Sequence, residues 1–319
     1  MSKIGKRRSV LRIIGWIANI TLFIFISLVF YVSIPIESDK NINLKPDSIG
    51  GIISQLSQKK YNIGQIDKYL LVLIGKPHSG WIYIGKNRLE RLEFLYLLTS
   101  ARSSFFRTTL VPGETTVIYL KSLAESNGLD EDRLIDSYSK ASLFREAGIL
   151  AESYNITKNL NEEEIVSYLL KYSLQRYKKL SNELLGKWDK KRWNRVLTIA
   201  SIVQKEAATI EEMPKVASVI YNRLKKKMRL QMDGALNYGL YSHIKVTPKR
   251  IKEDKTTYNT YRHKGLPDYP VCAVSIDAIR ASISPPTTKY LYFMKNSSGT
   301  HDFSTTYKKH LKRVKERRK

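Results

Sequence analysis

An uncharged segment of 24 residues near the amino terminus, at positions 13–36, constrains the fold most. A helix needs about 20 apolar residues to cross the hydrocarbon core of a bilayer, so this segment is long enough to span one. Basic residues precede it and acids follow it: Lys3, Lys6, Arg7, Arg8 and Arg12, then Glu37 and Asp39. Because basic residues favour the cytoplasmic side, the pattern predicts a cytoplasmic stub over 1–12, a transmembrane helix over 13–36 and an exported remainder.

A cleaved signal peptide is the alternative interpretation of this segment. Its apolar run is longer than a usual signal core, and the bulky sequence Ser33-Ile34-Pro35-Ile36 offers no small residues for cleavage. A retained single-pass anchor in the cytoplasmic membrane is therefore favoured.

The formal net charge of +26 would ordinarily indicate nucleic acid as the partner. An exported domain instead meets anionic lipid headgroups and anionic wall polymers, so we expect no nucleic-acid partner. A membrane-tethered nucleic-acid binder remains an alternative. Cys272 is the single cysteine, which excludes an intramolecular disulfide, and its neighbours predict a buried strand residue.

The rest of the chain predicts an α+β fold. Residues 37–48 are polar and suggest a linker, and short helices and strands alternate over 49–147, as in a small binding or spacing module. Longer helices are expected over 161–185, over 191–209 and from Pro214, within a mixed helix and strand domain over 148–319 that ends in a basic tail. The five histidines are scattered without metal-ligand spacing, so we expect no metal and no cofactor.

Glu206 is the candidate catalytic residue. Ile199, Ile202 and Val203 precede it by seven, four and three positions and therefore share its face of a helix. A carboxyl group against aliphatic side chains loses hydration, which raises its pKa as a general acid requires. On this pattern alone, an ordinary glutamate that reaches solvent or pairs with a lysine remains possible. Glu211 and Glu212 are expected to be solvated.

An ordered series of motifs follows Glu206 over about residues 195–310. It includes Tyr221-Asn222-Arg223-Leu224, Leu230-Gln231 with Asp233, Tyr258-Asn259-Thr260-Tyr261 and His301-Asp302-Phe303. In order and spacing, the series resembles the YceG-like endolytic murein transglycosylases. Residues 109–115 resemble the family more weakly and imply that the module over 49–147 is LysM-like. The sequence departs from the family pattern at Gln204, at Gly234 and over 267–270.

The resemblance implies a membrane-bound enzyme that cuts nascent peptidoglycan glycan strands between N-acetylmuramic acid and N-acetylglucosamine. It would leave 1,6-anhydro ends and so terminate strand elongation, with peptidoglycan synthases as candidate partners. The catalytic glutamate of the family corresponds to Glu206. The expected substrate-binding residues are Gln231, Tyr258, Asn259, Tyr261, Asn222, Arg223 and Asp233, although Asn222 and Arg223 could equally be structural.

Glu206 is the only acid on its apolar face, whereas ordinary glycoside hydrolysis uses two carboxylates. A single carboxyl suffices if the substrate supplies the nucleophile, so Glu206 is expected to act first as acid and then as base. Two alternatives stay open. One is a muramidase with Asp233 as base or nucleophile, and the other is a non-catalytic wall-binding scaffold for synthases.

Overall fold

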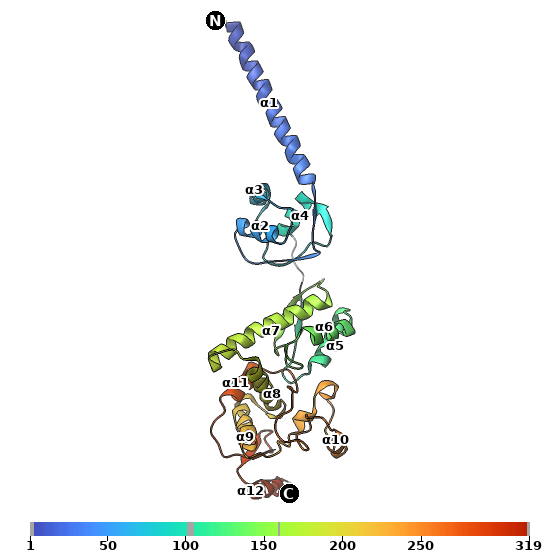
Figure 1. Cartoon of the computed structure of the whole chain (residues 1–319), viewed down its shortest axis with the longest axis vertical. Coiled ribbons are helices and arrows are strands. Elements are labelled where there is room, and N and C mark those ends of the chain that lie inside the picture. Colours follow the sequence, from blue (N-terminus) through green and yellow to red (C-terminus); the bar gives the residue numbers. More distant parts are fainter. Residues whose placement is uncertain (1–2, 101–104, 159, 318–319) are drawn as a thin grey trace. The chain divides into compact units, whose positions relative to one another are not determined.

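The computed structural model describes residues 3–100, 105–158 and 160–317, with side chains from residue 11 onward. The chain divides into two compact units. Unit 1 contains Met1–Phe106 with Thr157–Leu160, and unit 2 contains Arg107–Ile156 with Asn161–Lys319. Both units combine helices with short strands, so the fold is mixed α+β with an apolar helix at the amino terminus (Figure 1).

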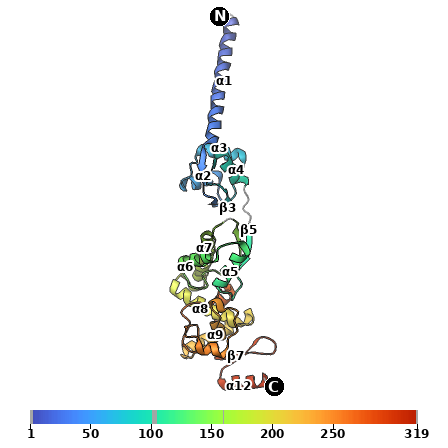
Figure 2. The ribbon, with the colours of Figure 1, turned by 90° about the vertical axis from the view of Figure 1, so that its right-hand side faces the viewer.

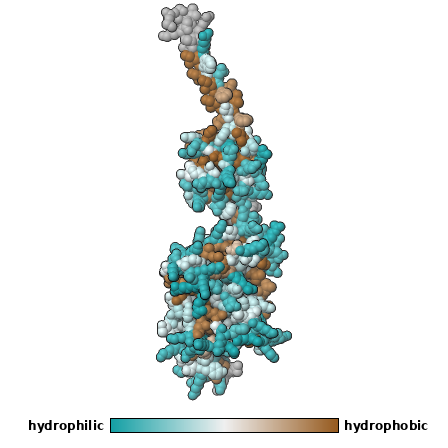
Figure 3. All heavy atoms as spheres, viewed as in Figure 1, coloured by the Kyte–Doolittle hydropathy of each residue, from teal (hydrophilic) through white to brown (hydrophobic). Residues whose placement is uncertain are grey.

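Unit 1 begins with helix α1 (Lys3–Ser33), whose stretch Leu11–Ser33 is long and apolar enough to cross a membrane. Figure 3 shows this apolar surface along α1. Two antiparallel strand pairs follow, β1 (Pro35–Glu37) with β4 (Arg88–Glu90) and β2 (Asn41–Leu44) with β3 (Gly80–Tyr83). They share one core with α2 (Ile49–Gln58), α3 (Gln65–Ile74) and α4 (Arg91–Ser100).

The segment 37–48 is not the linker that its polar composition predicted. Ile42 and Leu44 of β2 are buried, while Asn41 and Asn43 alternate with them. Side chains alternate between the two faces of a strand, so one face of β2 is buried when β2 pairs with β3. The compact units also divide near residue 106, so residues 107–147, which the sequence placed in the amino-terminal module, belong to unit 2.

Unit 2 is built around α8 (Lys190–Glu206), which packs against α9 (Met213–Lys225) and α11 (Ile276–Ile283). Helix α7 (Glu162–Leu185) matches the predicted helix, and its start is fixed by reciprocal hydrogen bonds between Asn161 and Glu164. The remaining helices are α5 (Thr116–Asn127), α6 (Glu131–Ala141), α10 (Pro248–Glu253) and α12 (Tyr307–Arg317). The strands form two pairs, β5 (Phe105–Thr109) with β6 (Ser153–Thr157) and β7 (Tyr292–Lys295) with β8 (His301–Ser304). Figure 2 labels β5 and β7.

Helix α8 ends earlier than the predicted range of 191–209, because Ala207 adopts an extended backbone and stops it at Glu206. Cys272 is fully buried as predicted, but it lies in an irregular segment and not in a strand. The hydroxyl of Ser201 in α8 accepts a hydrogen bond from the Val271 backbone and thereby holds this segment against the helix. The carboxyl end of α8 is thus fixed on several sides.

Candidate active site

Glu206 is the last residue of α8 and is partly buried. Ile199, Ile202 and Val203, which the sequence placed on its face, are fully buried in the core of unit 2. The carboxyl end of a helix carries partial negative charge, which disfavours a carboxylate there. The position of Glu206 therefore favours its protonated form.

A backbone amide holds the Glu206 carboxyl group in place. The Gly234 N–H, at the start of the 3-10 turn Asp233–Leu236, donates to Glu206 Oε1 at 2.7 Å. A Cβ atom on residue 234 would lie 2.8 Å from Oε1 and 2.6 Å from Lys205 Cβ, so only glycine allows this close approach. Gly234 thus supplies both the space and the donor, which gives a physical role to a position where the sequence departs from the family pattern.

The pKa of Glu206 is raised from its ordinary 4.5 to about 7. Burial is the main cause, and the negative charge of Asp233 adds to it. The Gly234 hydrogen bond and the positive charge of Arg223 act in the opposite direction. Because the pKa lies near neutral pH, both the acid and the base form of Glu206 are populated, which suits a group that transfers protons.

Asp233 and Tyr261 lie next to this carboxyl group and contact each other. The Tyr261 hydroxyl donates to Asp233 Oδ1 at 2.7 Å, and Asp233 directly precedes Gly234. Burial and the hydrogen bond to Asp233 raise the pKa of Tyr261, so it remains a hydroxyl donor. Asp233 is exposed, and Gln231 is an exposed residue two positions earlier with a left-handed backbone (φ 49°).

Arg223 and Asn222 of α9 are held by backbone carbonyls. Arg223 Nε donates to the carbonyl of Leu291 at 2.6 Å, and its guanidinium also bonds the carbonyl of Leu230. Asn222 Nδ2 donates to the carbonyls of Thr288 and Tyr290 at 3.0 and 2.9 Å. Both side chains therefore tie α9 to surrounding loops, and Arg223 also places a positive charge near Glu206.

Asn259 lies inside the protein, in contrast to its neighbour Tyr261. It is fully buried, and its Nδ2 donates to the carbonyls of Ile251 and Asp254 at 2.8 and 2.7 Å. Its Oδ1 accepts the Tyr261 backbone N–H at 3.2 Å. The structure thus gives Asn259 the role of fixing the loop that carries Tyr261.

Tyr258 faces a cavity of about 650 Å³ whose described lining does not include Glu206. Its ring stacks on Tyr238, with ring centroids 4.2 Å apart and an interplanar angle of 12°. Arg145, Glu146 and Tyr269 also line this cavity. The structure therefore brings Glu206, Asp233, Tyr261 and Arg223 together and places Tyr258 in a different pocket.

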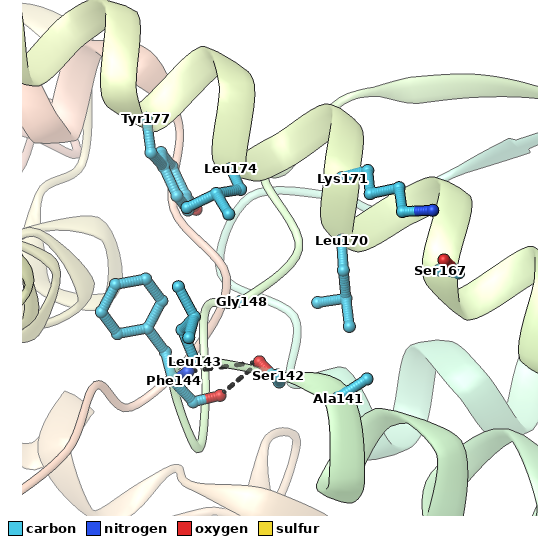
Figure 4. Close-up of a pocket in the computed structure, with 10 residues that line it drawn as sticks. All are labelled: Ala141, Ser142, Leu143, Phe144, Gly148, Ser167, Leu170, Lys171, Leu174 and Tyr177. Carbon is cyan, nitrogen blue, oxygen red and sulfur yellow. Dashed lines mark hydrogen bonds between the residues drawn. The ribbon is translucent and has the colours of Figure 1, made fainter.

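A smaller cavity of about 190 Å³ lies between α7 and the loop that follows α6. Its lining is mainly apolar, with Leu143, Phe144, Leu170 and Leu174, as Figure 4 shows. No carboxyl group is among its described lining residues. It therefore offers no acid for proton transfer.

Glu212 is not solvated as predicted, whereas Glu211 is exposed. Glu212 accepts the His301 backbone N–H at 2.5 Å, and His301 Nδ1 lies 2.8 Å from its other oxygen. Burial alone would raise the pKa of Glu212, but these bonds outweigh burial and lower it. The pair joins the turn before α9 to β8, so the role of His301 in the structure is a hydrogen bond that fixes this loop. Within residues 3–100, 105–158 and 160–317, no group of three or more His, Cys, Asp or Glu side chains could hold a metal ion.

Glu146 is a second buried acid that the sequence did not reveal. Its carboxyl group accepts the backbone N–H groups of Thr116 and Ala147 at 3.1 and 2.9 Å and the Thr116 hydroxyl, at the start of α5. Burial raises its pKa from 4.5 to about 7 despite these donors. The apolar residues around Glu146 follow neither a helical nor a strand period. Only the tertiary contact with α5 therefore identifies Glu146 as a buried acid.

We expect Glu146 to make unfolding pH-dependent. Its folded pKa lies above its unfolded pKa, so the stabilisation is complete below about pH 4.5 and is lost as the pH rises through about 7. The raised pKa of Glu146 corresponds to a loss of folding stability on the order of 3 kcal/mol. Denaturant titration at acidic pH and at about pH 8 gives the change in the free energy of unfolding between the two. In Glu146→Gln, this change should be smaller than in wild type by that amount. The exposed Glu125→Gln is the control, and an equal pH dependence in Glu146→Gln and wild type would refute the assignment.

The model of the YceG-like family matches residues 46–316. A Bacillus subtilis protein named endolytic murein transglycosylase is 34% identical over 150 residues, which cover 47% of this chain and 41% of that protein. A Streptococcus pneumoniae protein of the same name is 35% identical over 129 residues, or 39% of this chain and 23% of that protein. The matched segments thus span less than half the length of these relatives.

A solved structure has a similar fold. The crystal structure of a putative yceG-like protein from Listeria monocytogenes superposes with a TM-score of 0.58 at 23% sequence identity. The superposition covers 86% of this chain and 99% of that one.

Proposed function

Because this chain belongs to the YceG-like family, we propose that it is a membrane-anchored lytic transglycosylase of peptidoglycan. It cleaves the bond between N-acetylmuramic acid and N-acetylglucosamine within nascent glycan strands and thereby ends their elongation. The observation that carries this proposal is the partly buried Glu206 carboxyl group, with a pKa of about 7 and a fixed hydrogen bond from Gly234. The names of the Bacillus and Streptococcus relatives support it.

The proposed mechanism uses one carboxyl group twice. Protonated Glu206 gives its proton to the glycosidic oxygen as the bond to the muramic acid anomeric carbon breaks. The acetamido oxygen of the same sugar stabilises the positive charge that develops on that carbon. The Glu206 carboxylate then takes the proton of the sugar's 6-hydroxyl, whose oxygen bonds to the anomeric carbon and closes the 1,6-anhydro ring. No water is consumed, and the pKa near neutral suits both steps.

The substrate-binding roles follow from exposure and contact. We assign Gln231, Asp233 and Tyr261 to the sugars on either side of the cleaved bond, because they lie on the segments that surround Glu206. Tyr258 would bind a more distant sugar through the cavity that it lines. Arg223, Asn222 and Asn259 are positioning residues in this proposal, since their side chains bond backbone carbonyls.

The proposed topology follows from α1. It would hold the chain in the cytoplasmic membrane as a single-pass anchor, with the amino terminus in the cytoplasm and unit 2 outside. The module before the catalytic region would be LysM-like and bind the wall. Peptidoglycan synthases are the proposed protein partners.

A muramidase is the second candidate function, because Asp233 gives the site another carboxylate. Mass spectrometry of the products from uncrosslinked glycan strands, digested by the purified full chain, separates the two. The transglycosylase produces 1,6-anhydro ends, whereas hydrolysis produces reducing ends that are one water heavier. Reducing ends as the main product would overturn the proposed reaction, and intact strands would leave the scaffold as the function.

A further inference from the structure

The carboxyl end of α1 is fixed to the folded part of unit 1. The Tyr31 hydroxyl donates to Asp67 Oδ2 at 2.9 Å, and Arg91 Nη1 donates to the same oxygen at 2.8 Å. The Arg91 guanidinium also lies 4.3 Å from the centre of the Tyr31 ring. Asp67 lies in the first turn of α3, and Arg91 is the first residue of α4. The end of α1 therefore lies directly against the start of both helices.

Helix α3 carries apolar side chains that the core of unit 1 does not cover. Four of them form what we call the apolar face: Ile66, Tyr69, Val72 and Leu73, with Leu73 83% exposed. Ile66, Tyr69 and Leu73 follow a helical period and so lie along one side of α3, with Val72 beside them. The one acid of α3, Asp67, is fully buried, so α3 exposes no carboxylate.

The apolar face lies at the end of unit 1 from which α1 leaves. Ile66 directly precedes Asp67, the residue that binds Tyr31 near the end of the apolar stretch Leu11–Ser33. Figures 1 and 2 both show α3 at this end of the unit. A bilayer crossed by α1 would have its outer surface at about Ser33, since the apolar stretch ends there.

We propose that unit 1 rests on the outer surface of the bilayer, with the apolar face of α3 inserted among the lipid headgroups beside the end of α1. An amphipathic helix of this kind lies in the membrane plane with its apolar side about 5–10 Å below the surface. Tyr69 contributes a ring with a polar hydroxyl, the type of side chain that concentrates at membrane interfaces. The hydrogen bonds of Tyr31 fix α3 at this depth, because they hold its first turn against α1.

This inference depends on the proposed span of α1, and the test separates the two. Full-length variants Leu73→Cys, Tyr83→Cys and Phe23→Cys are each labelled with a fluorophore and reconstituted into phosphatidylglycerol vesicles. Lipids with nitroxides in the headgroup or deep in the acyl chain then quench the label according to its depth. Cys272 is fully buried and stays unlabelled. Tyr83 is the matched control, because it is an exposed aromatic residue on β3, which Figure 2 shows at the other end of unit 1.

We expect headgroup nitroxides to quench the label at position 73 several-fold more than the label at position 83. Acyl-chain nitroxides should quench position 23 the most. Equal quenching at positions 73 and 83, with strong deep quenching at 23, overturns the membrane-surface proposal alone and favours a protein partner for the apolar face. No deep quenching at position 23 overturns the span and this proposal together. Unchanged hydrogen exchange in the labelled variants shows that unit 1 stays folded.

Discussion

Replacing Glu206 with glutamine is expected to lower the rate of glycan cleavage by about 10²–10⁴-fold, the usual contribution of general acid–base catalysis. The amide is far too weak an acid to protonate the glycosidic oxygen and far too weak a base to take the proton of the 6-hydroxyl. Glutamine keeps the size of the side chain and an oxygen that can accept the Gly234 N–H. The fold should therefore persist. The measurement is the rate at which anhydro ends are released from uncrosslinked glycan strands, together with the melting temperature.

Glu211→Gln is the matched control for this experiment. Glu211 lies in the short turn after α8 and is exposed, so its replacement removes a carboxylate close in sequence to Glu206 and leaves the Glu206 carboxyl group in place. We expect this variant to cleave at the wild-type rate. Wild-type activity in Glu206→Gln would exclude the proposed acid. A cellular phenotype that survives Glu206→Gln would favour the scaffold alternative.

The helical spacing of apolar residues before Glu206 could be predicted, because it lies within one short segment. The hydrogen bond from Gly234 that completes the site could not. Ile199, Ile202 and Val203 are buried as the period of 3.6 residues requires. Gly234 reaches Glu206 across 28 residues of sequence, and its donor is a backbone amide, which no residue pattern reveals. The sequence therefore predicts the acid and leaves its hydrogen-bond partner to tertiary packing.

The difference between local sequence patterns and tertiary contacts also explains where Asn259 and Tyr258 lie. Hydroxyl groups, an amide and aromatic rings in one short stretch suit either a saccharide site, since these groups bind sugars, or a strand edge. Asn259 instead turns inward, because its amide donates to the carbonyls of Ile251 in α10 and of Asp254, which ends that helix. Tyr258 stacks on Tyr238, which lies twenty positions earlier in the sequence. Residue type thus suggests the ligand, whereas the fold decides which side chains remain available to it.

The fold was predicted best where one segment contains its own signals. Helix α7 begins at a capping box that is visible as Asn161 followed by Glu164, and it ends at Gly186 with a left-handed backbone. Strand β2 was missed, because Asn41 and Asn43 make the segment polar and its partner β3 lies about forty residues later. Strand pairing depends on a distant partner, so polar composition alone misidentified β2 as a linker.

Replacing Arg91 with methionine is expected to destabilise unit 1 by about 3–5 kcal/mol, the usual cost of breaking a buried ion pair on one side. Arg91 and Asp67 are 2% and 0% exposed, so the carboxylate would remain in the core without its counter-charge. Hydrogen exchange of the full chain, followed by mass spectrometry of peptides from β2 and β3, measures the opening free energy of this unit. Faster exchange should be confined to unit 1.

Two further variants separate a buried charge from lost packing. Adding Asp67→Asn to Arg91→Met removes the unpaired charge and keeps an oxygen for the hydroxyl of Tyr31, so much of the lost stability should return. Lys86→Met breaks the exposed pair with Glu93 and should cost less than about 1 kcal/mol, because solvent screens it. If Arg91→Met cost no more than Lys86→Met, the buried Arg91–Asp67 pair could not be the contact that stabilises the starts of α3 and α4.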